Sequence, residues 1–261
     1  MKPPTLAGLV DRRILVNYAV DPTVAGRLLP PPFRPQLVNG NAVAGICLIR
    51  LTRLRPAGLP AWVGVSSENA AHRVAVEWDD EDGTRTGVFI PRRDTGSALT
   101  RALGGRLFPG EHERAVFTTN ECDSHLEVAY SSRDGAVSVD VQVELTQRLG
   151  RSELFGDLEE ASEFFRKGSV GLSARGDALL DGLSLRTDSW SVEPAAPRHV
   201  RSSFFEDPAL FPPGSARLDC VLVMRGVPVT WRATAGPSCE PPAADTRAIR
   251  VSAQGAATGT V

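Results

Sequence analysis

The sequence predicts an α+β fold that is predominantly antiparallel β. About ten short runs rich in Val, Ile, Leu and aromatic residues are separated by turn-forming Gly, Pro, Asn and Asp. Two or three short segments have helical spacing, but they do not alternate regularly with the strands as a parallel α/β fold requires. No linker or repeat interrupts residues 1–232, so we expect one domain there and a disordered Ala/Gly/Pro-rich tail over residues 233–261.

The N-terminal elements are a strand and a short helix. Residues 13–20 (RILVNYAV) have the aliphatic and aromatic content of a strand. Asp21 and Pro22 then predict a helix over residues 23–29, because aspartate is a good N-cap and proline suits the first helical position. Three consecutive prolines follow and cannot continue that helix.

Two turn signals indicate β-hairpins in the next segment. Asn39-Gly40 is a strong signal for a two-residue hairpin turn. An acidic turn over residues 79–83 predicts a second hairpin, which would place the strand of Glu68 beside the strand of Arg92. The strands that flank these turns are predicted over residues 33–38, 42–51, 61–78 and 84–90.

The remaining chain is predicted to be mostly β-structure with two helices. Leucines four residues apart predict a helix over residues 95–107, and three glutamates with two phenylalanines predict another over residues 158–166. Further strands are predicted over residues 114–120, 125–131, 137–145, 168–173, 183–194, 200–205 and 217–231.

Composition excludes several classes of function. A formal net charge of −2 argues against nucleic acid or a membrane surface as partner. The four cysteines form no CxxC pair, so neither a metal site nor a disulfide framework is predicted. No signal peptide and no long apolar span are visible, which predicts a cytoplasmic protein. No phosphate-binding loop, dinucleotide fingerprint or nucleophile elbow is present, and no cofactor is predicted.

Short motifs spread along the chain carry a family resemblance. They are RILVNY from Arg13, SENAAHR from Ser67, IPRRD from Ile90, GSVG from Gly168 and SSFF from Ser202. Together, over about residues 10–231, they resemble the YqjF-like family of uncharacterised bacterial proteins, domain of unknown function 2071. That family is similar in fold to acetoacetate decarboxylase. The resemblance therefore implies a β-rich double sheet rolled into a cone or barrel around an internal cavity.

The sequence departs from the decarboxylase at its catalytic motif. Residues 89–93 read Phe-Ile-Pro-Arg-Arg where the decarboxylase has Gly-Tyr-Pro-Lys-Lys, whose first lysine forms a Schiff base with the keto acid. A guanidinium, with a pKa above about 12, supplies no neutral amine for that reaction. Only Lys2 and Lys167 are lysines, and Lys167 follows a predicted helix where solvent exposure is expected. Schiff-base decarboxylation is therefore not expected.

The two arginines of this motif are candidate ligand-binding residues. Arg92 and Arg93 are adjacent on an extended segment, so their side chains should point to opposite faces. Arg92 aligns with the Schiff-base lysine and is expected to point inward, where it would clamp a carboxylate, phosphate or enolate. Alternatively, Arg92 forms a buried ion pair with Glu68 or Asp94.

Four further residues complete the candidate site. Glu68 resembles the acidic residue near the decarboxylase lysine, and it would act as general base or simply neutralise an arginine. His72 lies four residues later on the same strand face, either for proton transfer or as a structural histidine. Asn69 offers a neutral hydrogen-bonding group. Arg12 or Arg13, in a register uncertain by one residue, resembles the N-terminal substrate-binding arginine of the decarboxylase.

Three functions remain open at this point. The first is binding of a small organic acid or carbonyl metabolite in a decarboxylase-like cavity without Schiff-base chemistry. The second is a lyase, isomerase or hydrolase in which Arg92 holds the anion and Glu68 or His72 moves a proton. The third is a structural homo-oligomeric protein. Whether the protein is an enzyme is left open by the sequence.

Overall fold

The computed structural model describes residues 5–103, 110–175 and 179–237 of the chain. Its strands are β1 (Leu6–Val20), β2 (Arg34–Pro35), β3 (Leu37–Val38), β4 (Asn41–Pro56), β5 (Val65–Asp80), β6 (Gly83–Thr95), β7 (Glu113–Glu121), β8 (His125–Ser132), β9 (Ser138–Leu145), β10 (Val170–Arg175), β11 (Leu179–Arg186), β12 (Glu193–Ser202) and β13 (Ala216–Ala235). The helices are α1 (Pro22–Gly26), α2 (Ala98–Leu103), α3 (Leu158–Lys167) and the short 3₁₀ helix η1 (Ala61–Val63).

The described strands form one hydrogen-bonded sheet that is mainly antiparallel, as predicted. Its main order is β11-β10-β6-β7-β8-β9-β12-β13-β1-β4-β5-β2, and β3 pairs with β4. Parallel pairing is confined to β6, which runs parallel to short stretches of β7 and β10. Two additional pairings, β5 with β6 and β11 with β13, bring the sheet back onto itself.

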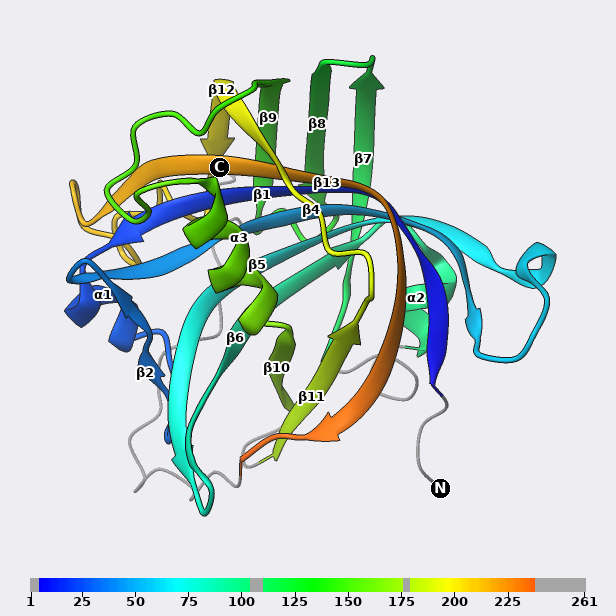
Figure 1. Cartoon of the computed structure of the whole chain (residues 1–261), viewed down its shortest axis with the longest axis horizontal. Helices are drawn as coiled ribbons and strands as arrows, with labels where there is room; N and C mark the ends of the chain where they lie inside the picture. Colours follow the sequence, from blue (N-terminus) through cyan, green and yellow to red (C-terminus); the bar gives the residue numbers. More distant parts are fainter. Residues whose placement is uncertain (1–4, 104–109, 176–178, 238–261) are drawn as a thin grey trace, which may run out of the picture.

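Five strands act as a wall shared by two interiors. The strands β13, β1, β4, β5 and β6 run across the middle of the molecule in Figure 1. The strands β7, β8 and β9 stand at the top of that view, whereas β10, β11 and α3 lie below the wall. Because successive side chains of a strand point to opposite faces, each wall strand contributes alternate residues to each interior.

The interior beside β7, β8 and β9 is filled by the largest apolar cluster. Even-numbered residues of β1 and β4, such as Ile14 and Ile46, pack there with Val128 and Val141 of the meander. Three aromatic residues that follow β12 complete this core: Phe204, Phe205 and Phe211. The odd-numbered residues of the same wall strands face the other interior, where the packing leaves a cavity.

Local sequence signals at the N-terminus act as predicted. The Asp21 side chain caps α1 by accepting hydrogen bonds from the backbone N–H groups of Thr23 and Val24 at 2.8 and 3.2 Å. The helix ends at Gly26, three residues earlier than expected. Asn39 and Gly40 have φ angles of 48° and 77°, the positive values that a two-residue hairpin turn needs.

Several further element boundaries differ from the expectation. The single strand predicted over residues 183–194 is two strands, because β11 ends at Arg186 and pairs with β10, whereas β12 begins at Glu193 and pairs with β9. The described part of the 95–107 helix is α2, over Ala98–Leu103. The last strand, β13, continues to Ala235 because its end pairs with β11.

The domain prediction stays a prediction. Residues 238–261 of the expected tail lie outside the described residues. Within the described part of the chain, none of the helices has the length and apolar character needed to cross a bilayer.

Candidate functional site

A cavity lies between the shared wall and the layer formed by β10, β11 and α3. It offers about 150 Å³ of space to water-sized groups, which corresponds to roughly ten such groups. One part of its lining is apolar: Leu51, Leu54, Leu183, Leu185, Trp190 and Trp231. The other part is polar and cationic: Arg13, Cys47, Asn69, Arg73, Arg93 and His112. The cavity lining therefore combines cationic groups with apolar side chains.

Strand alternation on β5 selects which residues reach the cavity. Ser67, Asn69, Ala71 and Arg73 are odd-numbered neighbours on one face, and all of them line the cavity. Asn69 is held in place because its amide nitrogen donates to the Ser67 hydroxyl at 2.9 Å and its oxygen accepts from the Thr95 hydroxyl at 2.8 Å. The amide is thus a fixed polar group at the cavity wall.

Arg73 reaches across the wall because Gly45 makes room for it. Asn17, Gly45 and Arg73 are register partners on the adjacent strands β1, β4 and β5. A Cβ atom at Gly45 would lie 2.2 Å from the carbonyl oxygen of Val16 and 3.2 Å from Arg73 Nη2. The guanidinium passes over Gly45 and donates to the side-chain oxygen of Asn17, while the ring of Phe165 on α3 lies 4.8 Å from its central carbon.

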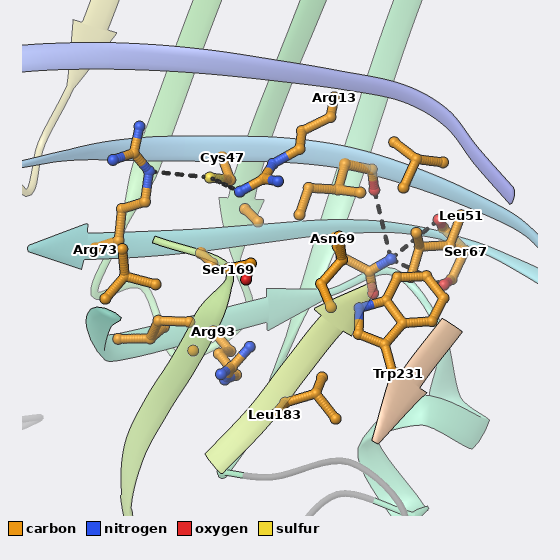
Figure 2. A pocket seen from close by; sticks show the side chains of 18 of the residues that line it. Arg13, Cys47, Leu51, Ser67, Asn69, Arg73, Arg93, Ser169, Leu183 and Trp231 are labelled. Carbon is orange, nitrogen blue, oxygen red and sulfur yellow. Dashed lines mark hydrogen bonds between the residues drawn. The ribbon is translucent and has the colours of Figure 1, made fainter. Parts of the chain in front are cut away.

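Cys47 lies between two arginines, as Figure 2 shows. Arg13 Nη2 is 3.4 Å and Arg73 Nε is 3.1 Å from the Cys47 sulfur. Burial by itself raises the pKa of the Cys47 thiol, but the charges and hydrogen bonds of Arg13 and Arg73 outweigh it, so that the pKa is lowered. Burial in turn lowers the pKa of Arg73, which is 2% exposed.

Arg93 is the third cation of the cavity. Its Nε donates to the Ser173 hydroxyl on β10 at 3.1 Å. Burial lowers the pKa of Arg93 to about 10, so the guanidinium stays charged at neutral pH. The charge of Arg93 also contributes, after burial, to lowering the pKa of His112 to about 4, against a hydrogen bond with the Gly110 carbonyl. His112 is therefore neutral at physiological pH.

The three cavity arginines lack carboxylate partners. Within the part of the chain that the structure describes, none of Arg13, Arg73 and Arg93 forms a salt bridge, whereas ten other arginines do. Each of the three keeps one buried N–H group without a hydrogen-bond partner among the described residues, on Arg13 Nε, Arg73 Nη1 and Arg93 Nη2. The site therefore concentrates positive charge that no carboxylate of the described residues balances.

The expected orientation of Arg92 and Arg93 is corrected by a β-bulge. Pairing of β5 with β6 passes from His72↔Arg92 to Val74↔Phe89, so that Ile90 and Pro91 together oppose Arg73. The extra residue shifts the alternation, and Ile90 and Arg93 both line the cavity. Arg92 points away and binds Asp94 at 2.8 Å and Asp134 at 3.0 Å. The ion pair with Asp94 is one of the alternatives that the sequence left open.

Glu68 and His72 share one strand face, as predicted, but that face is turned away from the cavity. Glu68 accepts hydrogen bonds from Arg12 at 2.6 Å and Arg50 at 2.5 Å. His72 is fully buried with its ring centroid 4.4 Å from that of Phe204, and neither ring nitrogen has a hydrogen-bond partner among the described residues. Both residues therefore belong to the filled interior.

Sequence reasoning found three cavity residues and missed others. Arg13, Asn69 and Arg93 line the cavity, whereas Arg12 pairs with Glu68. Arg73, Cys47 and His112 were not expected there. The signal for Arg73 was present, because it follows Asn69 at the period of a strand face. Among the described residues, no group of three or more His, Cys, Asp or Glu side chains is arranged to hold a metal ion.

The fold is that of acetoacetate decarboxylase-like enzymes. An acetoacetate decarboxylase-like enzyme from Sphingomonas wittichii RW1 superposes with a TM-score of 0.58 at 14% identity, covering 92% of this chain and 94% of that one. Acetoacetate decarboxylase from Legionella pneumophila gives 0.58 at 13% identity, covering 91% and 88%. The enduracididine biosynthesis enzyme MppR complexed with pyruvate gives 0.54 at 14% identity, covering 90% and 91%.

The family follows from sequence. The profile of DUF2071, described as an uncharacterized conserved protein, matches residues 10–227. The chain belongs to this family, as its motifs indicated. A search of curated proteins finds no match to the chain.

Proposed function

We propose that the protein binds a small carboxylic acid in its cavity, with Arg13, Arg73 and Arg93 holding the carboxylate. The observation that carries this proposal is that three arginines line one cavity, each with a buried guanidinium nitrogen, and none has a carboxylate partner among the described residues. Buried charges in proteins are normally paired, because an unpaired ion loses its hydration and gains nothing in return. A bound carboxylate would supply the missing charge, and a guanidinium can hold it with two parallel hydrogen bonds.

The rest of the ligand is proposed to be apolar or aromatic. Trp190, Trp231 and the leucines of β11 line the same cavity as the cationic residues. The available volume suits a ligand of about ten non-hydrogen atoms. The printed description of MppR, a structural neighbour of this chain, names pyruvate as its bound molecule, which supports a small oxo acid as the first compound to test.

Schiff-base chemistry is not part of this proposal. Lysine is not found among the described residues that line the cavity. Lys167 lies at the end of α3 with its side chain 67% exposed and its ammonium 3.3 Å from Glu163. The alternative with an Arg92 clamp and proton transfer by Glu68 or His72 is not carried forward, because these side chains face the other interior. The homo-oligomer and the cytoplasmic location stay predictions.

Titration calorimetry on the full chain tests acid binding. Pyruvate and phenylpyruvate are compared with their uncharged amides, using wild type, Arg93→Met and the control Arg85→Met. Arg85 lies on the same strand but is exposed and paired with Asp80 and Asp82. We expect Arg93→Met to weaken binding of the acids about 10- to 100-fold, because a hydrogen bond to a charged group contributes about 1.5–3 kcal/mol.

The control variant and the amides decide the outcome. Arg85→Met should bind the acids like wild type, and the amides should bind weakly to all three proteins. Equal affinity of an acid and its amide, or unchanged binding by Arg93→Met, would contradict the proposed role of the cationic residues.

A further inference from the structure

Cys47 is the side chain on which two cavity arginines converge. It is 2% exposed, lines the cavity, and accepts hydrogen bonds from Arg13 Nη2 at 3.4 Å and Arg73 Nε at 3.1 Å. Figure 2 shows the sulfur between the two guanidinium groups. A guanidinium offers only donors, and a neutral thiol is a weak acceptor, so this arrangement favours the thiolate.

Charge balance supports the same protonation state. Arg13 and Arg73 carry permanent positive charges, and no carboxylate within the described residues pairs with either of them. The Cys47 sulfur is the group in contact with both that can become an anion. The lowered pKa of its thiol, despite burial, agrees with this.

A second buried cysteine shows that burial by itself does not lower the pKa of a thiol in this protein. Cys220 on β13 also packs inside the molecule and accepts a hydrogen bond from Asn17 at 3.5 Å. Its charged neighbour is Asp219, and burial together with that carboxylate raises the pKa of Cys220 to about 12. Cys220 is therefore protonated at neutral pH. Cys47 differs because two arginines donate hydrogen bonds to its sulfur.

The two arginines that contact the sulfur each carry one further nitrogen without a partner among the described residues. Arg73 Nη1 and Arg13 Nε have no hydrogen-bond partner among the described residues, and both belong to guanidinium groups that already contact Cys47. A carboxylate held there would place its adjacent carbon near the sulfur. This step rests on the proposed acid-binding function, whereas the charge state of Cys47 rests on its contacts alone.

We propose that Cys47 is a thiolate nucleophile of this cavity that adds to the carbonyl carbon of a 2-oxo acid held by Arg13 and Arg73. In this step a sulfur lone pair forms the new carbon–sulfur bond. The π electrons of the carbonyl move to its oxygen, and the negative charge passes from sulfur to that oxygen beside the guanidinium groups. No group leaves and no further reactant is consumed, so the addition is reversible.

Selective alkylation of the full-length protein tests the nucleophile. Iodoacetate and iodoacetamide both form a carbon–sulfur bond with release of iodide, but only iodoacetate carries a carboxylate. Peptide mapping by mass spectrometry follows Cys47, with exposed Cys122 and buried Cys220 as internal controls. We expect iodoacetate to label Cys47 at least about tenfold faster than iodoacetamide does, and pyruvate to slow that labelling. Cys122 should show neither effect.

A pH titration of the far-ultraviolet absorbance of the thiolate gives a second readout of the Cys47 charge state. This measurement does not require a reagent to reach the buried sulfur. The difference between wild type and Cys47→Ser should show one thiolate formed well below the ordinary cysteine pKa of about 8.5. If the absorbance difference shows that the Cys47 thiolate forms only at or above that pH, the proposal is overturned. Labelling of Cys47 that follows the pH dependence of Cys122 would overturn it as well.

The two proposals fail in different ways. Calorimetry of Cys47→Ser with pyruvate reports acid binding without the thiol. Binding by Cys47→Ser together with a protonated Cys47 in wild type would overturn the nucleophile and leave acid binding intact. A thiolate at Cys47 with no preference for iodoacetate and no protection by pyruvate would overturn addition to a bound acid.

Discussion

At the scale of single residues, the cavity arginines differ from the arginines of the protein surface. Arg34, Arg85 and Arg217 are exposed and each forms a salt bridge with a nearby carboxylate. Arg73 and Arg93 have no carboxylate partner among the described residues, and burial lowers the pKa of both. A charge without a carboxylate partner is costly, so under the proposed function these side chains would serve binding at the expense of stability.

This contrast predicts opposite effects of one substitution on stability and binding. Arg93→Met should leave the free energy of unfolding unchanged or raise it by about 1–2 kcal/mol, because an unpaired buried charge is replaced by an apolar chain of similar length. Urea denaturation without ligand measures this, and the same variant should lose acid binding. Destabilisation by several kcal/mol would instead indicate a structural role for Arg93.

His72 predicts a pH dependence of stability. Burial, with a smaller contribution from Arg92, lowers the pKa of His72 to about 3 in the folded protein, whereas an unfolded histidine titrates near 6.5. Between these values the unfolded state binds more protons, so stability falls as the pH falls. The stability contributed by neutral His72 is complete above about pH 6.5 and declines by about 1.4 kcal/mol per pH unit below it.

Substitution of His72 isolates this contribution. His72→Phe should lower the slope of unfolding free energy against pH between about 6.5 and 4 relative to wild type. The exposed His199, 3.7 Å from Asp140, supplies the control His199→Gln, which should keep most of the wild-type slope. Equal slopes in wild type and His72→Phe would show that His72 is not held neutral by the fold.

At the scale of elements, three neighbouring strands depend on one glycine. The side chain of Arg73 on β5 crosses Gly45 on β4 to reach Asn17 on β1. A methyl group at Gly45 would collide with the backbone oxygen of Val16, so either the strands separate or the arginine is displaced. The position of a cavity cation is therefore set by the absence of a side chain on the adjacent strand.

Gly45→Ala should destabilise the protein by about 1–3 kcal/mol, the usual cost of forcing an extra carbon into a packed interior. It should also weaken acid binding, because Arg73 loses its path to Asn17. The control is Gly150→Ala, where no atom lies within 4 Å of the added Cβ. Thermal unfolding measures both variants, and equal melting temperatures would contradict the crowding at Gly45.

The β-bulge on β6 is a second local feature that determines which side chains line the cavity. Two residues, Ile90 and Pro91, face the single residue Arg73 of β5. Proline lacks an N–H group for the sheet ladder, and such residues are found at bulges. The irregularity turns Arg93 into the cavity and leaves Arg92 to pair with Asp94 and Asp134.

At the scale of the whole molecule, the shared wall separates a filled core from a cavity. The side facing β7, β8 and β9 receives the largest apolar cluster together with Glu68 and His72. The other side receives Arg13, Cys47, Asn69 and Arg73. A single strand thus supplies structural residues to one interior and candidate functional residues to the next.

Much of this architecture was predictable from local chemistry. The capping aspartate, the Asn39-Gly40 turn and the period-two runs indicated a mainly antiparallel β fold, and the motifs indicated its family. The hairpin that places the strand of Glu68 beside that of Arg92 was also correct. These features depend on neighbouring residues, so a single sequence contains the information.

The sequence by itself determined that positions 92 and 93 are arginines, and it predicted that Glu68 and His72 share a face. Only the tertiary structure decided which face borders the cavity and which arginine enters it. A strand pattern distinguishes two faces without saying what packs on each. A bulge, moreover, is defined by the partner strand, here by Arg73 opposing two residues of β6.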